Sequence, residues 1–249
     1  ETRIGAPSMA SLRSLLAFSK YQTVIAVGGR FYQWMDVLII GFFLSNTYVS
    51  AYEIAWQVTL LVLLVSKSLE LNLFPVISRW NAEGDGDRIG ETVTTALGYT
   101  MLVSIPAIVG AALYAREILT LVFQPAYAVA ALVLVVLMVE KAFQSCNDIV
   151  YASLRGIDRP RLAARATTVS VLVNLLLSPI LVVTVGFVGA AIATTTAWLV
   201  NLLLQYRSLS RFVTVSLPRR LLGWYVACSL LMGGVLLAVE QTLAVTGLL

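Results

Sequence analysis

Ionisable side chains stand inside apolar stretches of this chain, where they are costly to bury. Arg30 and Asp36 lie within V-G-G-R-F-Y-Q-W-M-D-V-L-I-I-G-F-F-L, and the next apolar stretch holds Glu53, Lys67 and Glu70. Each such group costs roughly 2.5–3.5 kcal/mol at the centre of a bilayer by insertion scales, so it seldom occurs there without a partner or a water-filled cavity. A guanidinium or ammonium group can bind an anion, and a carboxylate can bind a proton or a cation. The chemistry predicted here is therefore ion binding.

A stripe of polar residues marks a later apolar stretch, residues 126–152. Glu140, Gln144 and Asp148 recur at i, i+4 and i+8, the spacing of one helix face, and Lys141 and Asn147 lie beside them. Because lipid offers no hydrogen bonds, this face should contact protein or water. We therefore predict that this helix faces the charged stretches described above across a polar interior.

The composition is that of an integral membrane protein. Of the 249 residues, 59% are hydrophobic and 12% are charged, and the mean hydropathy is +0.88. Soluble domains carry about 25% charged residues, roughly twice this share. The alternating segments of about 10 residues that a membrane β-barrel requires are not seen in the sequence, so we expect an all-α fold.

The residue types present also limit the kinds of site that the chain can form. It has no histidine, and Cys146 and Cys228 both lie in apolar runs, so neither a zinc site nor a disulfide framework is expected. No basic, aromatic patch points to nucleic acid as a partner. The D-G-D sequence at residues 85–87 stands alone on a short turn, which disfavours a membrane glycosyltransferase. We predict no enzymatic activity, no metal site and no cofactor beyond a coupling H⁺ or Na⁺.

Seven apolar runs are long enough to cross a bilayer as helices of about 20 residues each. Residues 1–20 are predicted to be a cytoplasmic lead-in, either an interfacial amphipathic helix or a helical linker from a missing upstream half. Pro75 is expected to end the second run, Gly156 and Pro160 to mark a helix end and the next helix start, and residues 186–189 to form a four-residue turn with close helix packing. The predicted spans are 21–44, 49–74, 89–113, 126–152, 162–185, 189–206 and 221–245.

The loop charges predict how these spans are oriented. Most of the 17 basic residues fall on one side of the alternating spans, and in the loops only Arg116 falls on the other. The positive-inside rule then places the N-terminus in the cytoplasm and the C-terminal end of the chain outside the cell membrane. The residues on the basic side are Arg3, Arg13, Lys20, Arg79, Arg88, Arg155, Arg159, Arg161, Arg165, Arg207, Arg211, Arg219 and Arg220.

Several stretches of the chain resemble a known group of membrane transporters. D-V-L-I-I-G-F-F-L-S followed by V-S-A-Y-E-I-A-W-Q-V is similar to the opening of the second lobe of oligosaccharide flippases, of the superfamily that includes multidrug extruders and lipid II flippases. Within that stretch, the sequence A-Y-E-I-A-W is most similar to archaeal members. Three further stretches agree with the family in order and spacing. They are L-F-P-V-I-S-R-W with E-G-D, A-S-L-R-G-I-D-R-P-R-L, and N-L-L-L-S-P-I-L-V-V-T-V-G-F-V-G-A-A-I-A-T-T.

The resemblance implies a protein of about twelve to fourteen helices, with two six-helix lobes around a central cavity, that moves lipid-linked oligosaccharide across the membrane by alternating access. Residues 21–212 would form the second lobe, residues 213–249 an additional helix, and the first lobe would be missing from this chain. The implied partners are membrane lipid, the missing lobe, and a glycan on a polyprenyl (pyro)phosphate carrier.

Charge suggests roles for the polar residues in such a pathway. The carrier head group is anionic, so cations inside the spans should meet it. Arg30 is the first candidate, because its guanidinium can grip phosphate oxygens in a bidentate manner, and Lys67 and Lys141 come second. The carboxylates are expected to balance these cations or to bind a coupling ion, and the amides to line the pathway. These residues are Asp36, Glu53, Glu70, Glu140 and Asp148, with Gln144, Asn147 and Asn174.

Alternatives remain open at this point. A cation-coupled drug extruder would use Asp36 and Glu140 as ion carriers, and a non-transporting scaffold of a glycan-synthesis complex would use the polar residues for assembly alone. Individual residues also have structural interpretations: Asn174 could hydrogen-bond across helices, and Glu53 and Asp148 could be solvated helix ends.

Overall fold

The computed structural model describes residues 9–216 and 219–245, and within these ranges the chain is helical without a strand. The predicted all-α membrane class is confirmed. Six helical segments of the described residues are long and apolar enough to span a membrane, so this is a multi-pass membrane protein. The seventh predicted span, 21–44, lies on α1. The elements are α1 (Met9–Phe43), α2 (Asn46–Thr59), the 3-10 segment η1 (Leu60–Val62), α3 (Leu63–Glu83), α4 (Gly86–Val122), the 3-10 segment η2 (Pro125–Ala130), α5 (Ala131–Gly156), α6 (Pro160–Val185), α7 (Phe187–Leu209) and α8 (Arg219–Val245).

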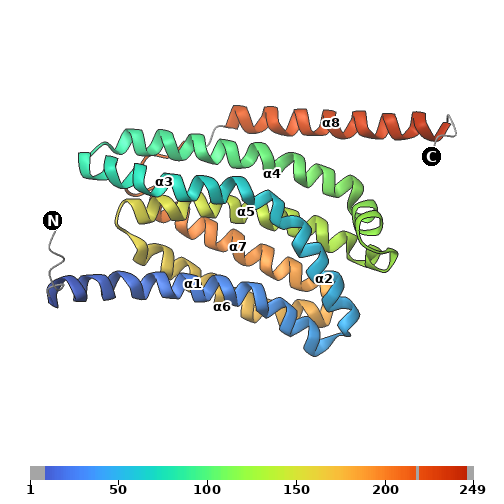
Figure 1. Cartoon of the computed structure of the whole chain (residues 1–249), viewed down its shortest axis with the longest axis horizontal. Helices are drawn as coiled ribbons and strands as arrows, with labels where there is room; N and C mark the ends of the chain where they lie inside the picture. The colour runs from blue at the N-terminus through green and yellow to red at the C-terminus, as the bar shows by residue number, and fades with distance from the viewer. Residues whose placement is uncertain (1–8, 217–218, 246–249) are drawn as a thin grey trace, which may run out of the picture.

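The helices run up and down in a bundle with α5 and α7 at its centre (Figure 1). α1 and α6 pack together on one side, α3 and α4 lie on the other, and α8 packs against α4 at the edge. Two clusters of buried apolar side chains hold the bundle: one includes Ile40 and Leu134, and the other includes Ile77 and Ile149. Polar side chains of α5 occupy the length of helix between these two clusters.

The basic connections lie at one end of the bundle. The start of α1 and the α3–α4, α5–α6 and α7–α8 connections are at the same end in Figure 1, which we call the basic end. Arg155 and Arg207 lie there, whereas Arg116 lies toward the opposite end. The alternation of charge along the sequence therefore corresponds to two ends of one bundle. Which end faces the cytoplasm stays a prediction.

α3 continues past the proline that was expected to end it. The second span was expected to end at Pro75, but α3 runs through it to Glu83 and ends at Gly84, whose φ is 73°. α4 passes Pro106, which the predicted span 89–113 also contains, and its backbone kinks at Tyr114 (φ −123°, ψ 19°), where that span was predicted to end, before the helix continues to Val122. Proline is tolerated inside membrane helices, because neighbouring helices and side chains satisfy the freed backbone groups. The residues after Pro75 continue the helix, and Ile77 among them is fully buried.

Some helix ends agree with prediction and others do not. Gly156 is the last residue of α5 and Pro160 the first of α6, as the sequence predicts. The predicted four-residue turn between α6 and α7 is wrong: Gly186 alone connects them, with a φ of 79°, and α7 begins at Phe187. The chain can turn so sharply because Gly189 has no Cβ. A Cβ at this position would collide with the carbonyl group of Leu181. The predicted close packing at Gly189 is confirmed.

Gly189→Val should destabilise the protein, because the added side chain has only backbone to displace. Overpacking of this kind costs roughly 1–3 kcal/mol or more. The measurement is the thermal unfolding temperature of the full-length protein in detergent. Gly110→Ala is the matched control, since no atom lies within 4 Å of a Cβ built there. A Gly189→Val protein as stable as the wild type would contradict the packing described here.

Candidate functional site

Two polar cavities lie one after the other along α5. The first, which we call the Asp36 cavity, has a volume of about 100 Å³ and lies between α1, α2, α5 and α7. The second, the Asp148 cavity, has a volume of about 190 Å³ and lies nearer the basic end. Gly29, Gln144 and Trp198 line both cavities. The polar stripe predicted on α5 therefore lines both cavities.

Asp36 is the centre of the first cavity. Its side chain is only 3% exposed, and its carboxylate accepts hydrogen bonds from Tyr52 Oη on α2 and Thr194 Oγ1 on α7, both at 2.6 Å. Ser178 Oγ on α6 donates a third, longer bond at 3.4 Å. Within the described part of the chain, no cation lies within ion-pair distance of Asp36. Asp36 thus links α2, α6 and α7 to α1 through hydrogen bonds from hydroxyl groups. Its carboxylate lies in the interior without a described cation beside it.

Asn174 extends this network from α6. Its Nδ2 donates to Thr194 Oγ1 at 2.8 Å, while its buried Oδ1 has no hydrogen-bond partner among the described residues. The alternative prediction of a hydrogen bond between helices is confirmed for this residue. The free amide oxygen also leaves an acceptor close to Asp36.

A buried ion pair forms the opposite wall of the same cavity. Lys141 Nζ lies 2.7 Å from Glu140 Oε2 and donates to Gln144 Oε1 at 3.0 Å. The ammonium group also lies 5.2 Å from the centre of the Trp56 ring, within cation–π range. Glu140 and Lys141 are 0% and 3% exposed. Glu140 Oε1 has no hydrogen-bond partner in the described structure, so this carboxylate retains a free acceptor.

The Asp148 cavity contains a second set of charges. Lys67 Nζ lies 2.8 Å from Asp148 Oδ1 and 3.0 Å from Glu70 Oε2, and Ser66 Oγ donates to Asp148 Oδ2 at 3.0 Å. The predicted i, i+3 pair of Lys67 and Glu70 is confirmed, and Asp148 makes it a triad that joins α3 to α5. Asp148 is buried, so the alternative of a solvated helix end does not hold for it. The side chain of Asn147 lines the same cavity.

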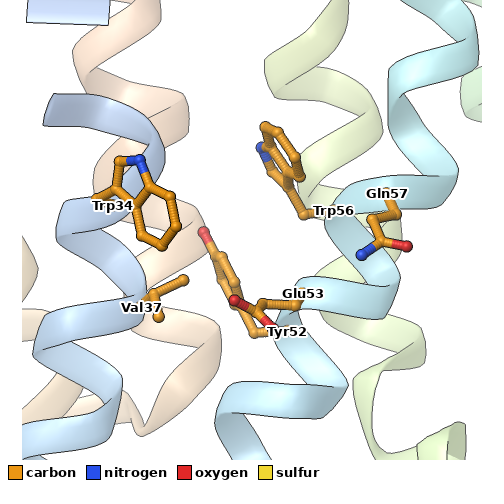
Figure 2. Close-up of a pocket in the computed structure, with 6 residues that line it drawn as sticks. All are labelled: Trp34, Val37, Tyr52, Glu53, Trp56 and Gln57. Carbon is orange, nitrogen blue, oxygen red and sulfur yellow. The ribbon is translucent and has the colours of Figure 1, made fainter. Parts of the chain in front are cut away.

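Two charged residues of the predicted site lie outside these cavities. Arg30 follows Gly29 on α1 and is exposed, and no described carboxylate lies within ion-pair distance of it. Arg30 and Asp36 therefore occupy different faces of α1, as their spacing predicts. Glu53 is half-buried and lines a third, open cavity between α1 and α2 (Figure 2).

Several residues that line the cavities or bond to Asp36 could not be predicted from the sequence. Tyr52 and Ser178 are 16 and 142 residues from Asp36 in the chain, so their bonds to it depend on the fold. Trp34 and Trp56, which line the third cavity, resemble any other aromatic residues of an apolar span. Polar spacing identified the charged residues, and the hydroxyl and aromatic residues around them had to be found in the structure.

Comparison with known proteins gives relatives over the full length of the chain. The chain is 39% identical over 248 residues to a probable low-salt glycan biosynthesis flippase, Agl15, from Haloferax volcanii. It is 28% identical over 220 residues to a probable flippase, AglR, from the same organism. These alignments cover 100% and 87% of this chain but 52% and 46% of the relatives, so the chain spans about half the length of the relatives it matches.

A solved structure shares the fold. The lipid II flippase MurJ in an inward closed conformation superposes with a TM-score of 0.73 at 19% identity, over 86% of this chain and 46% of that one. Residues 3–132 match the family described as polysaccharide biosynthesis protein. The helical bundle, the resemblance in sequence and this match agree, and the chain belongs to the polysaccharide biosynthesis protein family.

Proposed function

We propose that the protein containing this chain moves lipid-linked oligosaccharide across the cell membrane by alternating access, and that this chain forms its second lobe with one additional helix. The relatives named as flippases and the MurJ-like fold support this proposal. So do the two neighbouring cavities, lined by charged and amide side chains, inside helices that are otherwise apolar. The lipid carrier is expected to be a polyprenyl (pyro)phosphate, whose charge must be met by cations during the crossing.

The choice of Arg30 as the head-group contact depends on its exposure and on the absence of a described acidic partner. Lys67 and Lys141 each lie within 3.0 Å of a carboxylate, whereas Arg30 is exposed and has no described acidic partner. A guanidinium that is not neutralised by the protein is available to an anionic ligand, and its planar fork matches phosphate oxygens. We therefore assign the head-group contact to Arg30. Lys67 and Lys141 become secondary candidates that must first exchange a carboxylate for phosphate.

The carboxylates divide into two roles in this proposal. Glu70 and Asp148 balance Lys67, and Glu140 balances Lys141. Asp36 has no described cation, and hydroxyl groups surround it together with the free Oδ1 of Asn174 nearby. Oxygen ligands of this kind suit a proton or a hard cation such as Na⁺. Asp36 is accordingly the coupling site, with the amides of Gln144 and Asn147 lining the path beside it.

Arg30→Gln in the full-length protein should abolish surface glycan assembly while the amount of protein in the membrane stays normal. The amide removes the positive charge from an exposed side chain, so folding should be unaffected. The measurement is glycosylated surface protein in cells, alongside immunoblots of the membrane fraction. Arg116→Gln, an exposed arginine near the opposite end, is the matched control.

The result also separates the alternatives. Normal glycan output from the Arg30→Gln protein would remove Arg30 from the site. Efflux of cationic dyes by the wild-type protein, lost on replacing Asp36, would favour a drug extruder. A scaffold predicts that variants of the buried charges change complex assembly and never the flux of lipid-linked glycan.

A further inference from the structure

The open cavity between α1 and α2 presents an exposed tryptophan, Trp34. It has a volume of about 190 Å³, and Figure 2 shows Trp34 projecting from α1 and Trp56 from α2 on its opposite sides. Tyr52 and Glu53 rise from α2 between them, and Gln57 also contributes to the lining. Trp34 is 56% exposed although it is the largest kind of side chain. Two indole rings, a carboxylate and an amide thus surround one accessible space.

This set of groups suits a sugar ring. A pyranose presents weakly positive C–H groups on its faces and hydroxyl groups around its edge. The face of an indole carries the negative part of the ring quadrupole, so it attracts those C–H groups and excludes water from them. The Glu53 carboxylate can accept hydrogen bonds from neighbouring hydroxyls, and the Gln57 amide can both donate and accept. Polar groups of this kind, set among aromatic walls, fix the orientation of a small ligand.

The position of Arg30 matches such a ligand. Arg30 and Trp34 are at i and i+4 on α1 and both are exposed, so they share a face about 6 Å apart along the helix axis. In a lipid-linked saccharide, the phosphate is bonded directly to the first sugar. An anion held by Arg30 therefore places that sugar beside Trp34, in the direction of the α1–α2 turn.

The charges of the cavity favour a neutral sugar over the other ligands that an aromatic cavity can bind. An acidic sugar would meet the carboxylate of Glu53. A cationic ligand would compete with Lys141, whose ammonium group already lies 5.2 Å from the Trp56 ring centre. It would also lie next to the positive charge of Arg30.

We propose that Trp34, Trp56, Glu53 and Gln57 form the subsite for the phosphate-proximal, neutral sugar of the transported lipid. The proposal rests on the proposed function and adds to it the part of the substrate that this lobe recognises. Tyr52 and Trp56 line both this cavity and the Asp36 cavity. The sugar subsite and the coupling site therefore share a wall, with Tyr52 hydrogen-bonded to Asp36 at 2.6 Å.

The test measures binding of defined lipids to the purified full-length protein in nanodiscs. The probes are polyprenyl monophosphate without a sugar, the same lipid carrying one glucose or one mannose, and ethidium as a cation. We expect wild-type protein to bind a glycosylated lipid more tightly than the bare phosphate. Trp34→Ala should remove this preference, a loss of roughly threefold to tenfold in affinity, and leave binding of the bare phosphate unchanged.

Two further variants serve as controls. Trp34→Phe keeps an aromatic face and should retain most of the preference, and Trp224→Ala removes an exposed tryptophan on α8 and should change nothing. Equal affinity of wild-type protein for bare and glycosylated lipids, or an undiminished preference in Trp34→Ala, overturns the subsite while the lipid-phosphate function stands. Ethidium binding that requires Trp34, without a preference for sugar, replaces the subsite with a cation site. Failure of the wild type to bind either kind of lipid overturns the subsite and the proposed function together.

Discussion

Asp36→Asn in the full-length protein is expected to stop transport while leaving the fold in place. The amide has nearly the shape of the carboxylate, and its oxygen can still accept hydrogen bonds from Tyr52 and Thr194. It cannot take up a proton or hold Na⁺ by charge, so an ion gradient can no longer drive the cycle. We expect surface glycan to fall to the level of cells that lack the gene, and stability to change by no more than about 1 kcal/mol.

The experiment compares surface glycan in cells and ion-dependent flux of lipid-linked glycan in vesicles. Asp158→Asn is the matched control, since Asp158 is exposed and its φ of 63° is one that asparagine adopts readily. Flux measured with and without Na⁺, and with the proton gradient dissipated, identifies the ion. Undiminished flux in the Asp36→Asn protein would show that this carboxylate is structural.

Lys141→Met is expected to be the most destabilising of the charge variants. It leaves the carboxylate of Glu140, which is 0% exposed, without its ion-pair partner in an interior where an unpaired charge is costly. Removing one member of a buried pair costs about 3–5 kcal/mol. The expected result is a much lower unfolding temperature and reduced accumulation of the protein in the membrane.

The double variant Glu140→Gln/Lys141→Met provides the internal comparison. With both charges removed, no unpaired ion is buried, so most of the lost stability should return even though two side chains have changed. Thermal unfolding of the single and double variants in detergent gives the coupling between the two residues. Single variants that are no less stable than the double variant would contradict the ion pair described here.

The class of fold and the line of charged residues could be predicted because both follow local rules. Apolar runs of membrane length and loop charge define helices and their alternation, and a spacing of four residues defines the stripe on α5. The pairing of Lys67 with Glu70 follows from the same periodicity. The bond from Lys67 to Asp148 crosses 81 residues, and no local rule indicates it. Which cations have an acidic partner among the described residues, Lys67 and Lys141 but not Arg30, depends on the three-dimensional structure.

The predicted boundaries were wrong where tertiary contacts outweigh local preference. Pro75 was expected to end a helix but lies inside α3, because the surrounding helices stabilise a helical backbone that the proline alone would interrupt. The α6–α7 turn is shorter than predicted, because Gly189 lets two backbones touch, and a sequence does not show that contact. Gly156 and Pro160 were recognised correctly as a helix end and a helix start, whereas the effect of Pro75 depended on its neighbours.

The 3-10 segment Leu60–Val62 divides one membrane-spanning stretch into two helices, α2 and α3, that contact different partners. α2 is bonded to α1 through Tyr52 and Asp36, and α3 is bonded to α5 through Lys67 and Asp148. A 3-10 turn within a helix has poorer hydrogen-bond geometry and often marks a hinge. Binding of an ion to Asp36 in the proposed cycle would compete with the Tyr52 hydrogen bond, one of several contacts that hold α2, whose Ala51 and Ala55 also pack in the buried core. A change at this bond would then reach α2, which carries Glu53, Trp56 and Gln57 of the proposed sugar subsite, while α3 stays paired with α5.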